Sequence, residues 1–268
     1  MSNETYFKAN RDSWNKRAGV HKDSAFYALD DFKKGKTALN KIELSELGDV
    51  SGKKLMHLQC HFGMDTLSWA REGAEVTGVD FSNDAIDIAN NLKDELHIPA
   101  TFICSNVYDL LQYKNLSGAF DIVFTSYGVI GWLPDLEKWA EVIAHLLKPG
   151  GVFYMAEFHP VVWMMDEDFE YIKYFYHNEE IIEEDITGTY ADRDASIIHK
   201  NFSWNHSISE VLNALIKHHL KIEHFNEFNY SVHDCFNKTV KGEDGFWRIK
   251  GIENKIPMMY SVKAVYTP

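Results

Sequence analysis

Short apolar runs alternate with helical periodicities between residues 53 and 157. The runs lie at 54–58, 75–80, 101–104, 120–124 and 151–156. Most of the stretches between them repeat apolar residues every three or four positions, as one buried face of a helix does. Regular alternation of strand and helix is typical of parallel strands joined by crossover helices. The pattern therefore predicts a doubly wound, Rossmann-like α/β sheet.

Helix boundaries in this region carry their own signals. Ser82 is a good N-cap for the helix after the second strand, and Pro99 lies just past that helix. A later helix follows Pro134 and stops at Lys-Pro-Gly-Gly, residues 148–151. The connection over 105–119 is predicted to be only partly helical.

The remaining segments have different patterns. A stretch rich in Trp, Tyr, Glu and Asp follows the fifth strand and continues no α/β alternation. Ser207 and Glu210 then form a capping box before an apolar helix, and strands are predicted at 221–228 and 259–266. We therefore predict one domain that comprises a helical leader (1–45), an α/β core (46–157), a lid or insertion (158–206) and a last helix with late strands (207–268).

Charge and cysteine content narrow the possible partners. The chain has 268 residues with 27 basic and 40 acidic side chains, a net charge of −13. This excess disfavours nucleic acid and anionic membranes. The opening residues lack the pattern of a secretory signal, and no apolar stretch is long enough to span a membrane. Three widely spaced cysteines favour a reducing compartment, so we expect a cytoplasmic protein with a small-molecule partner. The sequence does not indicate the oligomeric state.

Candidate ligand-binding residues follow the strands, because ligands of open α/β sheets collect at the carboxyl ends of strands. The first turn contains Gln59, Cys60, His61 and Gly63. A tight turn lets backbone N–H groups face a ligand, and Gly63 leaves the approach free of a side chain. A dinucleotide fingerprint needs three glycines and this turn has one, so the turn alone is weak support for nucleotide binding.

The second, third and fourth strands end in polar residues. Asp80 can accept hydrogen bonds from ribose hydroxyls; the alternative is a helix cap, which Ser82 already offers. Asn106 and the adjoining Val107 could bind a nucleobase through hydrogen bonds, or Asn106 could form a plain Asx turn. The fourth strand is followed by two polar residues, Thr125 and Ser126, which complete the list of candidate ligand-binding residues.

This series of motifs resembles the class I S-adenosylmethionine-dependent methyltransferases. The family's first strand and turn typically read V-L-D-L-G-C-G-T-G, where this chain has L-M-H-L-Q-C-H-F-G at 55–63. The second-strand end Val79-Asp80-Phe81-Ser82, the fourth strand at 120–123 and the block L-K-P-G-G-V-F at 147–153 also match. The resemblance implies a seven-stranded sheet with an antiparallel last strand.

The departures leave two interpretations. His57 stands where the family usually has Asp, and Gln59 and His61 stand where it usually has Gly. One interpretation is a subfamily that binds the cofactor with a Q-C-H-F-G turn; the other is a member that has lost binding. We favour the first, because Asp80 and the rest of the pocket frame remain.

The resemblance implies S-adenosyl-L-methionine as cofactor, with Asp80 on its ribose and Phe81 covering its adenine. It also implies methyl transfer by in-line displacement, here to a small-molecule acceptor. The alternatives are a non-catalytic protein that binds S-adenosylmethionine or S-adenosylhomocysteine and an NAD-dependent oxidoreductase. The missing second glycine and the 148–151 block argue against the oxidoreductase.

A general base is needed only if the acceptor loses a proton. His159 and His206 are the candidates, whereas Glu157 is interpreted as structural or substrate-orienting.

No metal site is predicted. His57 and His61 are four residues apart, but they lie across the change from strand to turn rather than on one face of a helix, and a metal ion there would occupy the cofactor turn. Several aromatic residues could line the pocket or fill a small core of their own: Trp14, Tyr27, Trp132, Trp163, Tyr190 and Trp204.

Overall fold

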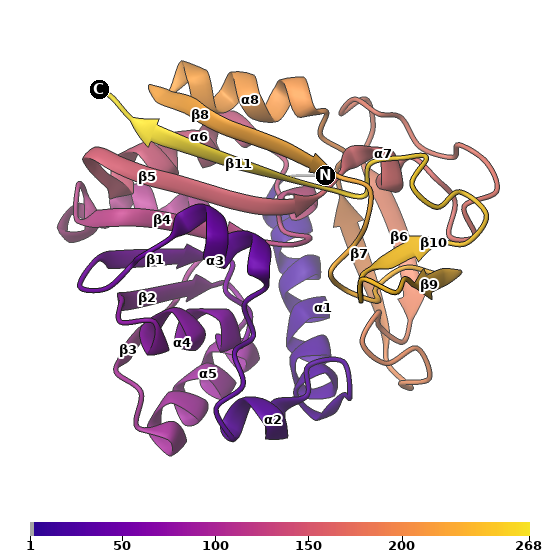
Figure 1. Ribbon diagram of the computed structural model, residues 1–268, viewed down its shortest axis with the longest axis horizontal. Coiled ribbons are helices and arrows are strands. Elements are labelled where there is room, and N and C mark those ends of the chain that lie inside the picture. The colour runs from indigo at the N-terminus through magenta and orange to yellow at the C-terminus, as the bar shows by residue number, and fades with distance from the viewer. Residues whose placement is uncertain (1–2) are drawn as a thin grey trace.

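A computed structural model describes residues 3–268, and its centre is a seven-stranded sheet (Figure 1). Across the sheet the strands are β3 (Ala100–Cys104), β2 (Glu75–Asp80), β1 (Lys54–Leu58), β4 (Phe120–Ser126), β5 (Leu147–Phe158), β11 (Met259–Tyr266) and β8 (Leu220–Phe228). The first five are mutually parallel, and β11 is antiparallel to both of its neighbours. The predicted Rossmann-like sheet with an antiparallel last strand is therefore confirmed.

The fifth strand differs in one detail from its prediction. It begins at Leu147, which pairs with Phe120, whereas the sequence predicts a start at residue 151. The pairing then shifts so that Val152 lies opposite Ile122. Residues 148–151 bulge out of the ladder, so the Lys-Pro-Gly-Gly block interrupts the strand rather than preceding it.

The helices of the core begin and end close to the predicted signals. They are α4 (Met64–Arg71), α5 (Asn83–Leu96), α6 (Leu136–Leu146) and α8 (Ile208–Lys217). Ser82 caps α5 by accepting from the Ala85 amide at 3.1 Å, and Ser207 caps α8. The 105–119 connection contains two short 3₁₀ turns, η1 (Val107–Gln112) and η2 (Lys114–Leu116). Among the helices of residues 3–268, none is long and apolar enough to cross a membrane.

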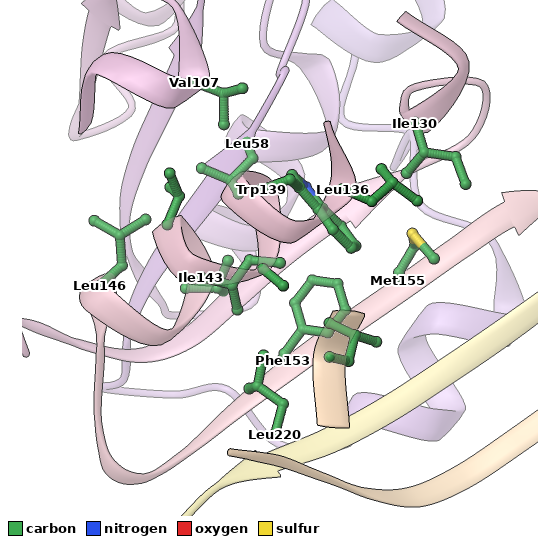
Figure 2. Close-up of a cluster of buried hydrophobic side chains, with 14 of the residues drawn as sticks. Leu58, Val107, Ile130, Leu136, Trp139, Ile143, Leu146, Phe153, Met155 and Leu220 are labelled. Carbon is green, nitrogen blue, oxygen red and sulfur yellow. The ribbon is translucent and has the colours of Figure 1, made fainter. Parts of the chain in front are cut away.

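The largest part of the core lies between the sheet and α6 and α8. The apolar face of α6 presents Trp139 and Ile143, both with no exposed surface, to Phe153 of β5 (Figure 2). Leu58, at the end of β1, and Leu220 of β8 belong to the same cluster. This packing fixes the strand ends from which the candidate ligand-binding residues project.

The leader and the insertion form one cover over the carboxyl ends of the strands. The leader holds α1 (Asn3–Asp23), α2 (Leu29–Lys33) and α3 (Lys41–Leu47); the insertion holds α7 (Pro160–Trp163) and a hairpin of β6 (Ile182–Thr187) and β7 (Ile198–Ser203). Helix α1 stands between the sheet and this hairpin (Figure 1). The Asn10 side chain donates to the Phe202 carbonyl at 2.7 Å and accepts from its amide at 2.8 Å, so α1 is joined to β7.

A second hairpin lies where the sequence predicts no element. It consists of β9 (Thr239–Lys241) and β10 (Trp247–Ile249). The segment that leads to it, after β8, reaches back to the carboxyl ends of the strands and adds residues to the wall of the cavity that lies there.

Candidate functional site

A cavity of about 1050 Å³ lies at the carboxyl ends of β1, β2 and β4, beneath the leader and the insertion. We call it the central cavity. It is lined by nine of the ten residues predicted to bind a cofactor: Gln59, Cys60, His61, Gly63, Asp80, Phe81, Asn106, Val107 and Ser126. Thr125 is the exception, because its hydroxyl is fully buried and donates to the Leu58 carbonyl at 3.2 Å.

The first turn keeps a glycine-like backbone although two of its residues are large. Gln59 has φ 54° and His61 has φ 51°, both in the left-handed region. A non-glycine residue pays about 1–2 kcal/mol for that conformation. Side-chain contacts offset this strain: Gln59 Nε2 donates to the Val129 carbonyl at 2.9 Å, and His61 Nε2 lies 3.0 Å from His21 Nδ1. The larger side chains thus line the central cavity without filling it.

Gly63 has two structural requirements of its own. Its φ is +79°, and a Cβ at this position would lie 2.6 Å from the Phe102 ring of β3. The absent side chain therefore permits close packing of the turn on β3, in addition to leaving the cavity wall open. The sequence pattern predicts only the second of these roles.

The Asp80 carboxylate holds the first turn in place by accepting backbone hydrogen bonds. Its Oδ2 accepts from the His61 amide at 2.8 Å and its Oδ1 accepts from the Ser82 amide at 2.9 Å. Burial raises the pKa of Asp80 to about 6, against the opposing effect of these backbone hydrogen bonds. Each oxygen retains acceptor capacity, so an ionised Asp80 can receive further hydroxyl donors from the cavity.

The third strand leads into an Asx turn, which is one of the two interpretations that the sequence allows for Asn106. Asn106 Oδ1 accepts from the Tyr108 amide at 3.1 Å and so caps η1. Asn106 and Val107 nevertheless line the central cavity, as does Phe81 at the end of the second strand.

Glu157 holds the loop after β4. Its carboxylate accepts from the backbone amides of Gly128, of Val129 at 2.8 Å and of Ile130 at 3.2 Å. Burial raises the pKa of Glu157, and these hydrogen bonds oppose the rise. Its geometry is that of a residue that positions the loop, and Glu157 also lines the central cavity.

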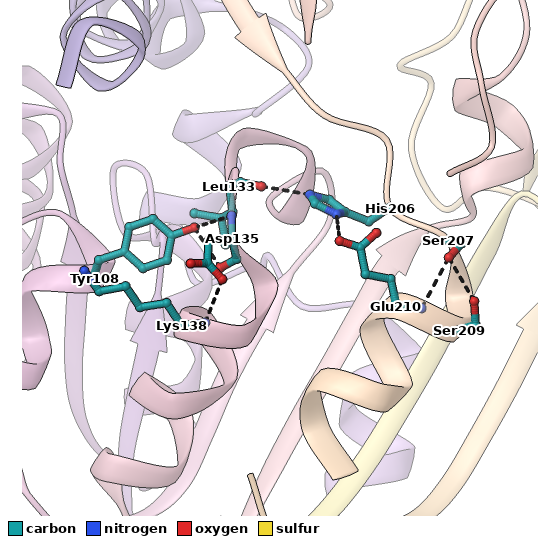
Figure 3. A network of polar contacts seen from close by, with 8 residues as sticks. All are labelled: Tyr108, Leu133, Asp135, Lys138, His206, Ser207, Ser209 and Glu210. Atoms are coloured by element: carbon teal, nitrogen blue, oxygen red, sulfur yellow. Dashed lines mark hydrogen bonds and ion pairs between the residues drawn. The ribbon is translucent and has the colours of Figure 1, made fainter. Parts of the chain in front are cut away.

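His159 and His206 lie outside the central cavity. His159 Nε2 lies 2.9 Å from Glu227 Oε1, and its Nδ1 accepts from the Val161 amide as a cap of α7. His206 Nε2 lies 2.8 Å from the Leu133 carbonyl oxygen, and its Nδ1 lies 3.0 Å from Glu210 Oε1 (Figure 3). Both rings are nearly fully buried and join neighbouring elements. Their placement does not support the expected role of general base.

The aromatic residues named from the sequence meet at the cavity. Its wall includes all six of them: Trp14, Tyr27, Trp132, Trp163, Tyr190 and Trp204. The hydroxyl groups of Tyr27 and Tyr190 are 2.6 Å apart, which joins the leader to the insertion. Pocket lining, rather than a separate core, therefore accounts for at least these two residues.

Sequence reasoning missed three chemically important residues of the wall. His233 packs edge-on against Tyr127, with ring centroids 5.0 Å apart, and burial lowers the pKa of His233 to about 4. Asp65 Oδ2 accepts from the Ser126 hydroxyl at 3.0 Å, and burial raises the pKa of Asp65 to about 6. Arg17 of α1 is 5% exposed and stacks on indole rings. The position of Asp65, two residues after Gly63, is the one signal that could have revealed any of them.

No three His, Cys, Asp or Glu side chains in residues 3–268 come together as a possible metal site. His57, which flanks the turn, is buried, and its Nδ1 lies 2.8 Å from the Thr66 hydroxyl. Burial lowers the pKa of His57 to about 3, so the ring is neutral at physiological pH.

Comparison with known proteins agrees with this geometry. Residues 56–153 match the family described as "Methyltransferase domain". The ubiquinone biosynthesis O-methyltransferase of Photorhabdus laumondii is 33% identical over 108 residues, which are 40% of this chain and 44% of that protein. The enzyme of the same name from Chromobacterium violaceum is 33% identical over 102 residues, covering 38% and 43%. The match thus spans less than half the length of these curated relatives.

Solved structures extend the likeness to most of the chain. An S-adenosylmethionine-dependent methyltransferase from Clostridium acetobutylicum superposes with a TM-score of 0.59 at 15% identity, over 96% of this chain and all of that one. Geranyl diphosphate C-methyltransferase from Streptomyces coelicolor superposes with a TM-score of 0.55 at 15% identity, over 85% and 74%. At these identities the likeness concerns the fold.

The strand order and the cavity at the strand ends define a doubly wound α/β protein of the nucleotide-binding kind. Within that class, the matched domain and the antiparallel β11 give the chain the class I S-adenosylmethionine-dependent methyltransferase fold.

Proposed function

We propose that this chain transfers a methyl group from S-adenosyl-L-methionine to a small-molecule acceptor, and that its Q-C-H-F-G turn marks a subfamily that binds the cofactor. The observation that carries the proposal is the Asp80 carboxylate, which faces the central cavity at the end of β2 and is held there by the first turn. This is the position from which a carboxylate can bind a ribose.

Unpartnered polar atoms of the turn fit the other end of the cofactor. Gln59 Oε1 and His61 Nδ1 are buried and have no hydrogen-bond partner among the described residues. A buried polar atom without a partner is costly, so a ligand that supplies one is favoured. The ammonium and carboxylate groups of the methionine moiety are such partners, and we assign adenine to the part of the cavity lined by Phe81, Asn106 and Val107.

When bound, the cofactor supplies an electrophilic methyl group on a sulfonium. The chain positions the two reactants and excludes water. The central cavity, at about 1050 Å³, is at the upper end of the range for single-ligand pockets, so it has room for an acceptor beside the cofactor. This room favours an enzyme over a non-catalytic binding protein.

The small-molecule acceptor is supported by the relatives and by charge. The matched proteins are named as methyltransferases of ubiquinone biosynthesis and of geranyl diphosphate. A net charge of −13 disfavours nucleic acid as substrate, and the three free cysteines are consistent with the cytoplasm. For acceptors that must lose a proton, His233 and Asp65 are the titratable residues that we assign to this task, because both line the cavity.

Two measurements test the proposal. Calorimetric titration should show binding of S-adenosylhomocysteine and no preference for NAD; a preference for NAD would refute it. Single-turnover reactions with methyl-labelled S-adenosylmethionine and a small-metabolite extract should then move the label to an acceptor. Tight binding without transfer to any fraction would identify a non-catalytic binding protein instead.

A further inference from the structure

His233 presents an imidazole with two free nitrogens to the central cavity. The ring lines the cavity and makes no hydrogen bond or ion pair within residues 3–268. Neither nitrogen is among the fully buried atoms of this part of the chain that lack a partner, so both reach accessible space. The other histidines of the wall are engaged: His57 Nδ1 lies 2.8 Å from the Thr66 hydroxyl, and His61 Nε2 lies 3.0 Å from His21 Nδ1. His233 is therefore the imidazole that is free to accept a proton from a ligand.

The backbone that carries His233 is held by a turn. The Ser231 hydroxyl is fully buried, accepts from the His233 amide at 3.1 Å and donates to the His233 carbonyl at 2.7 Å. Ser231 is itself joined to Trp247 of β10 by two backbone hydrogen bonds of 2.8 Å. A proton acceptor held in place before the substrate binds needs no reorganisation during the reaction.

Two aromatic rings contact the imidazole and fix where it lies. Tyr127, directly after β4, meets it edge-on with ring centroids 5.0 Å apart, and the Phe26 ring of the leader lies at 5.7 Å. The Tyr127 hydroxyl donates to the buried Glu43 carboxylate at 2.8 Å, which anchors this ring to α3. Tyr127 has φ 24°, a strained value for a residue with a side chain, and such strain persists only where the surrounding contacts impose it.

The order of the strands separates His233 from the proposed ribose and adenine positions. Asp80 ends β2 and Asn106 follows β3, whereas Tyr127 follows β4 and Phe158 ends β5. From β2 to β5 the sheet order is β2-β1-β4-β5, so these two strands are about 14 Å apart at about 4.8 Å per step. The turn after β1, which we assign to the methionine end of the cofactor, lies between them. His233, which packs on Tyr127, is therefore on the side of the methyl group rather than of the nucleoside.

The wall that continues from Tyr127 is aromatic. Phe158 lies 6.0 Å from Tyr127 and 5.1 Å from Phe236, measured between ring centroids. Trp163 contacts both phenylalanines, with centroids 5.8 Å from Phe158 and 5.5 Å from Phe236. All four rings line the central cavity. Aromatic compounds pack favourably on such rings, so this wall fits an acceptor with an aromatic body.

The chemistry of His233 selects the acidity of the acceptor. Burial lowers the pKa of His233 to about 4, so the ring is neutral at physiological pH but has a low proton affinity. Phenols, with a pKa of about 10, lose a proton to such a base far more readily than alkyl hydroxyls, whose pKa is close to the 15.7 of water. The rings that contact His233 are uncharged, so an alkylammonium would have no counter-ion beside it.

We propose that His233 is the general base of methyl transfer and that the acceptor is a phenol whose aromatic body lies against Tyr127, Phe158 and Phe236. This inference rests on the proposed function, which it deepens by naming the base and the class of acceptor. In the transfer step, the phenol oxygen bonds to the methyl carbon and gives its proton to an imidazole nitrogen of His233. The sulfur keeps the electron pair of the broken C–S bond, so the positive charge passes from the sulfonium to the imidazolium.

The test compares acceptors that need a base with one that does not. Wild-type protein and His233→Asn receive methyl-labelled S-adenosylmethionine with phenol, β-naphthol or para-nitrophenol. At about pH 8 para-nitrophenol is mostly ionised, whereas phenol and β-naphthol, with pKa values of about 10, are not. We expect His233→Asn to lower kcat about 100-fold or more for phenol and β-naphthol, and less than about threefold for para-nitrophenol, because an ionised acceptor has no proton to lose.

His177→Asn is the matched control, because His177 is an exposed histidine of the insertion that lies outside the central cavity. It should leave all three rates unchanged. Thermal melting verifies that each variant is folded. His233→Phe keeps the ring contacts but has no nitrogen, and it replaces His233→Asn if that variant does not melt cooperatively.

Three outcomes would overturn the inference. If the His233 variants methylate phenol at the wild-type rate, His233 is not the base. If they lose activity towards para-nitrophenol as strongly as towards phenol, the role of His233 is structural. If wild-type protein labels none of the phenols, the acceptor class is wrong, and label on benzylamine or cyclohexanol in parallel reactions would identify an amine or an alkyl alcohol instead.

Binding measurements separate this inference from the proposed function. Failure of wild-type protein to bind S-adenosylhomocysteine would contradict the methyltransferase proposal. Phenol and anisole, which lacks the hydroxyl proton, are therefore also titrated against the cofactor-free protein. A preference for phenol of about 3- to 10-fold that His233→Phe abolishes would support His233 as the partner of the hydroxyl, whereas no preference would refute that contact by itself.

Discussion

Replacing Asp80 with alanine should separate ligand binding from folding. The substitution removes the acceptor of two backbone amides, those of His61 and Ser82, at a site where the carboxylate is 8% exposed. A buried donor left without an acceptor costs about 1–3 kcal/mol, so the two amides together cost about 2–6 kcal/mol.

An opposing effect reduces this loss. Burial raises the pKa of Asp80 from 3.8 to about 6, which means that the ionised carboxylate is itself unfavourable in the folded protein at neutral pH. About two pKa units correspond to about 3 kcal/mol that Asp80→Ala relieves. The net loss of free energy of unfolding should therefore lie between about −1 and 3 kcal/mol, less than the loss of two hydrogen bonds alone suggests.

The same substitution should change the affinity for S-adenosylhomocysteine more than it changes the stability. Hydrogen bonds from a ribose to a charged acceptor contribute about 1.5–3 kcal/mol, so the Kd for S-adenosylhomocysteine should rise about 10- to 150-fold. Calorimetric titration measures the affinity, urea unfolding measures the stability, and Asp87→Ala on the exposed face of α5 serves as the control. An unchanged Kd in a folded Asp80→Ala protein would show that the ribose does not lie at Asp80.

Three further outcomes are expected. Protonation of Asp80 removes an acceptor, so S-adenosylhomocysteine affinity should fall as the pH drops below about 6; Asp80→Ala should flatten that part of the profile, and a persistent slope would assign it elsewhere. Gly63→Ala should lower the free energy of unfolding by about 2–4 kcal/mol, partly restored by Phe102→Leu, in urea unfolding; no restoration would rule out the predicted contact. His159→Gln should lower kcat by less than about tenfold in a turnover assay, because loss of a general base costs about 100-fold or more.

The raised pKa of Asp80 also fixes the sign of its effect on stability. Its pKa in the folded protein lies above its unfolded value of 3.8, so the folded state binds the proton more tightly. The contribution of Asp80 to stability therefore increases as the pH falls from about 6 towards 3.8. Loss of binding in that window cannot be attributed to unfolding caused by Asp80.

The fold was predictable because each strand and helix of the core is marked by a local sequence pattern. Apolar runs such as 120–124 are buried on both faces of the sheet, and polar caps such as Ser82 mark where the helices begin. The order of these signals along the chain determines the strand ends, which is why the sequence identifies Asp80 and Asn106 as candidates. The 229–258 segment has no such periodicity, so neither its hairpin nor His233 was foreseen.

The buried polar face of α1 shows a different limit. Asn10, Ser13, Arg17 and His21 recur at intervals of three and four, a pattern that would normally indicate a solvent-facing stripe. Three of them, Asn10, Ser13 and His21, have partners elsewhere in the chain: the Ser13 hydroxyl, for example, donates to Asn201 Oδ1 at 2.7 Å, 188 residues away. Residue type alone cannot distinguish a hydrated polar face from one paired across the fold.

The large residues of the first turn connect the strand ends to the buried polar face of α1. A glycine adopts the left-handed backbone freely, whereas His61 needs compensation, and it receives this from α1 through His21 Nδ1 at 3.0 Å and an edge-on contact with Trp14. Burial lowers the pKa of both histidines, to about 2 for His21 and about 3 for His61, so the rings meet as neutral donor and acceptor. The Q-C-H-F-G turn therefore depends on the leader in a way that a glycine-rich turn does not. Since the same helix carries Arg17 and Trp14, which also line the central cavity, α1 connects the shape of the proposed cofactor turn to the wall of the cavity.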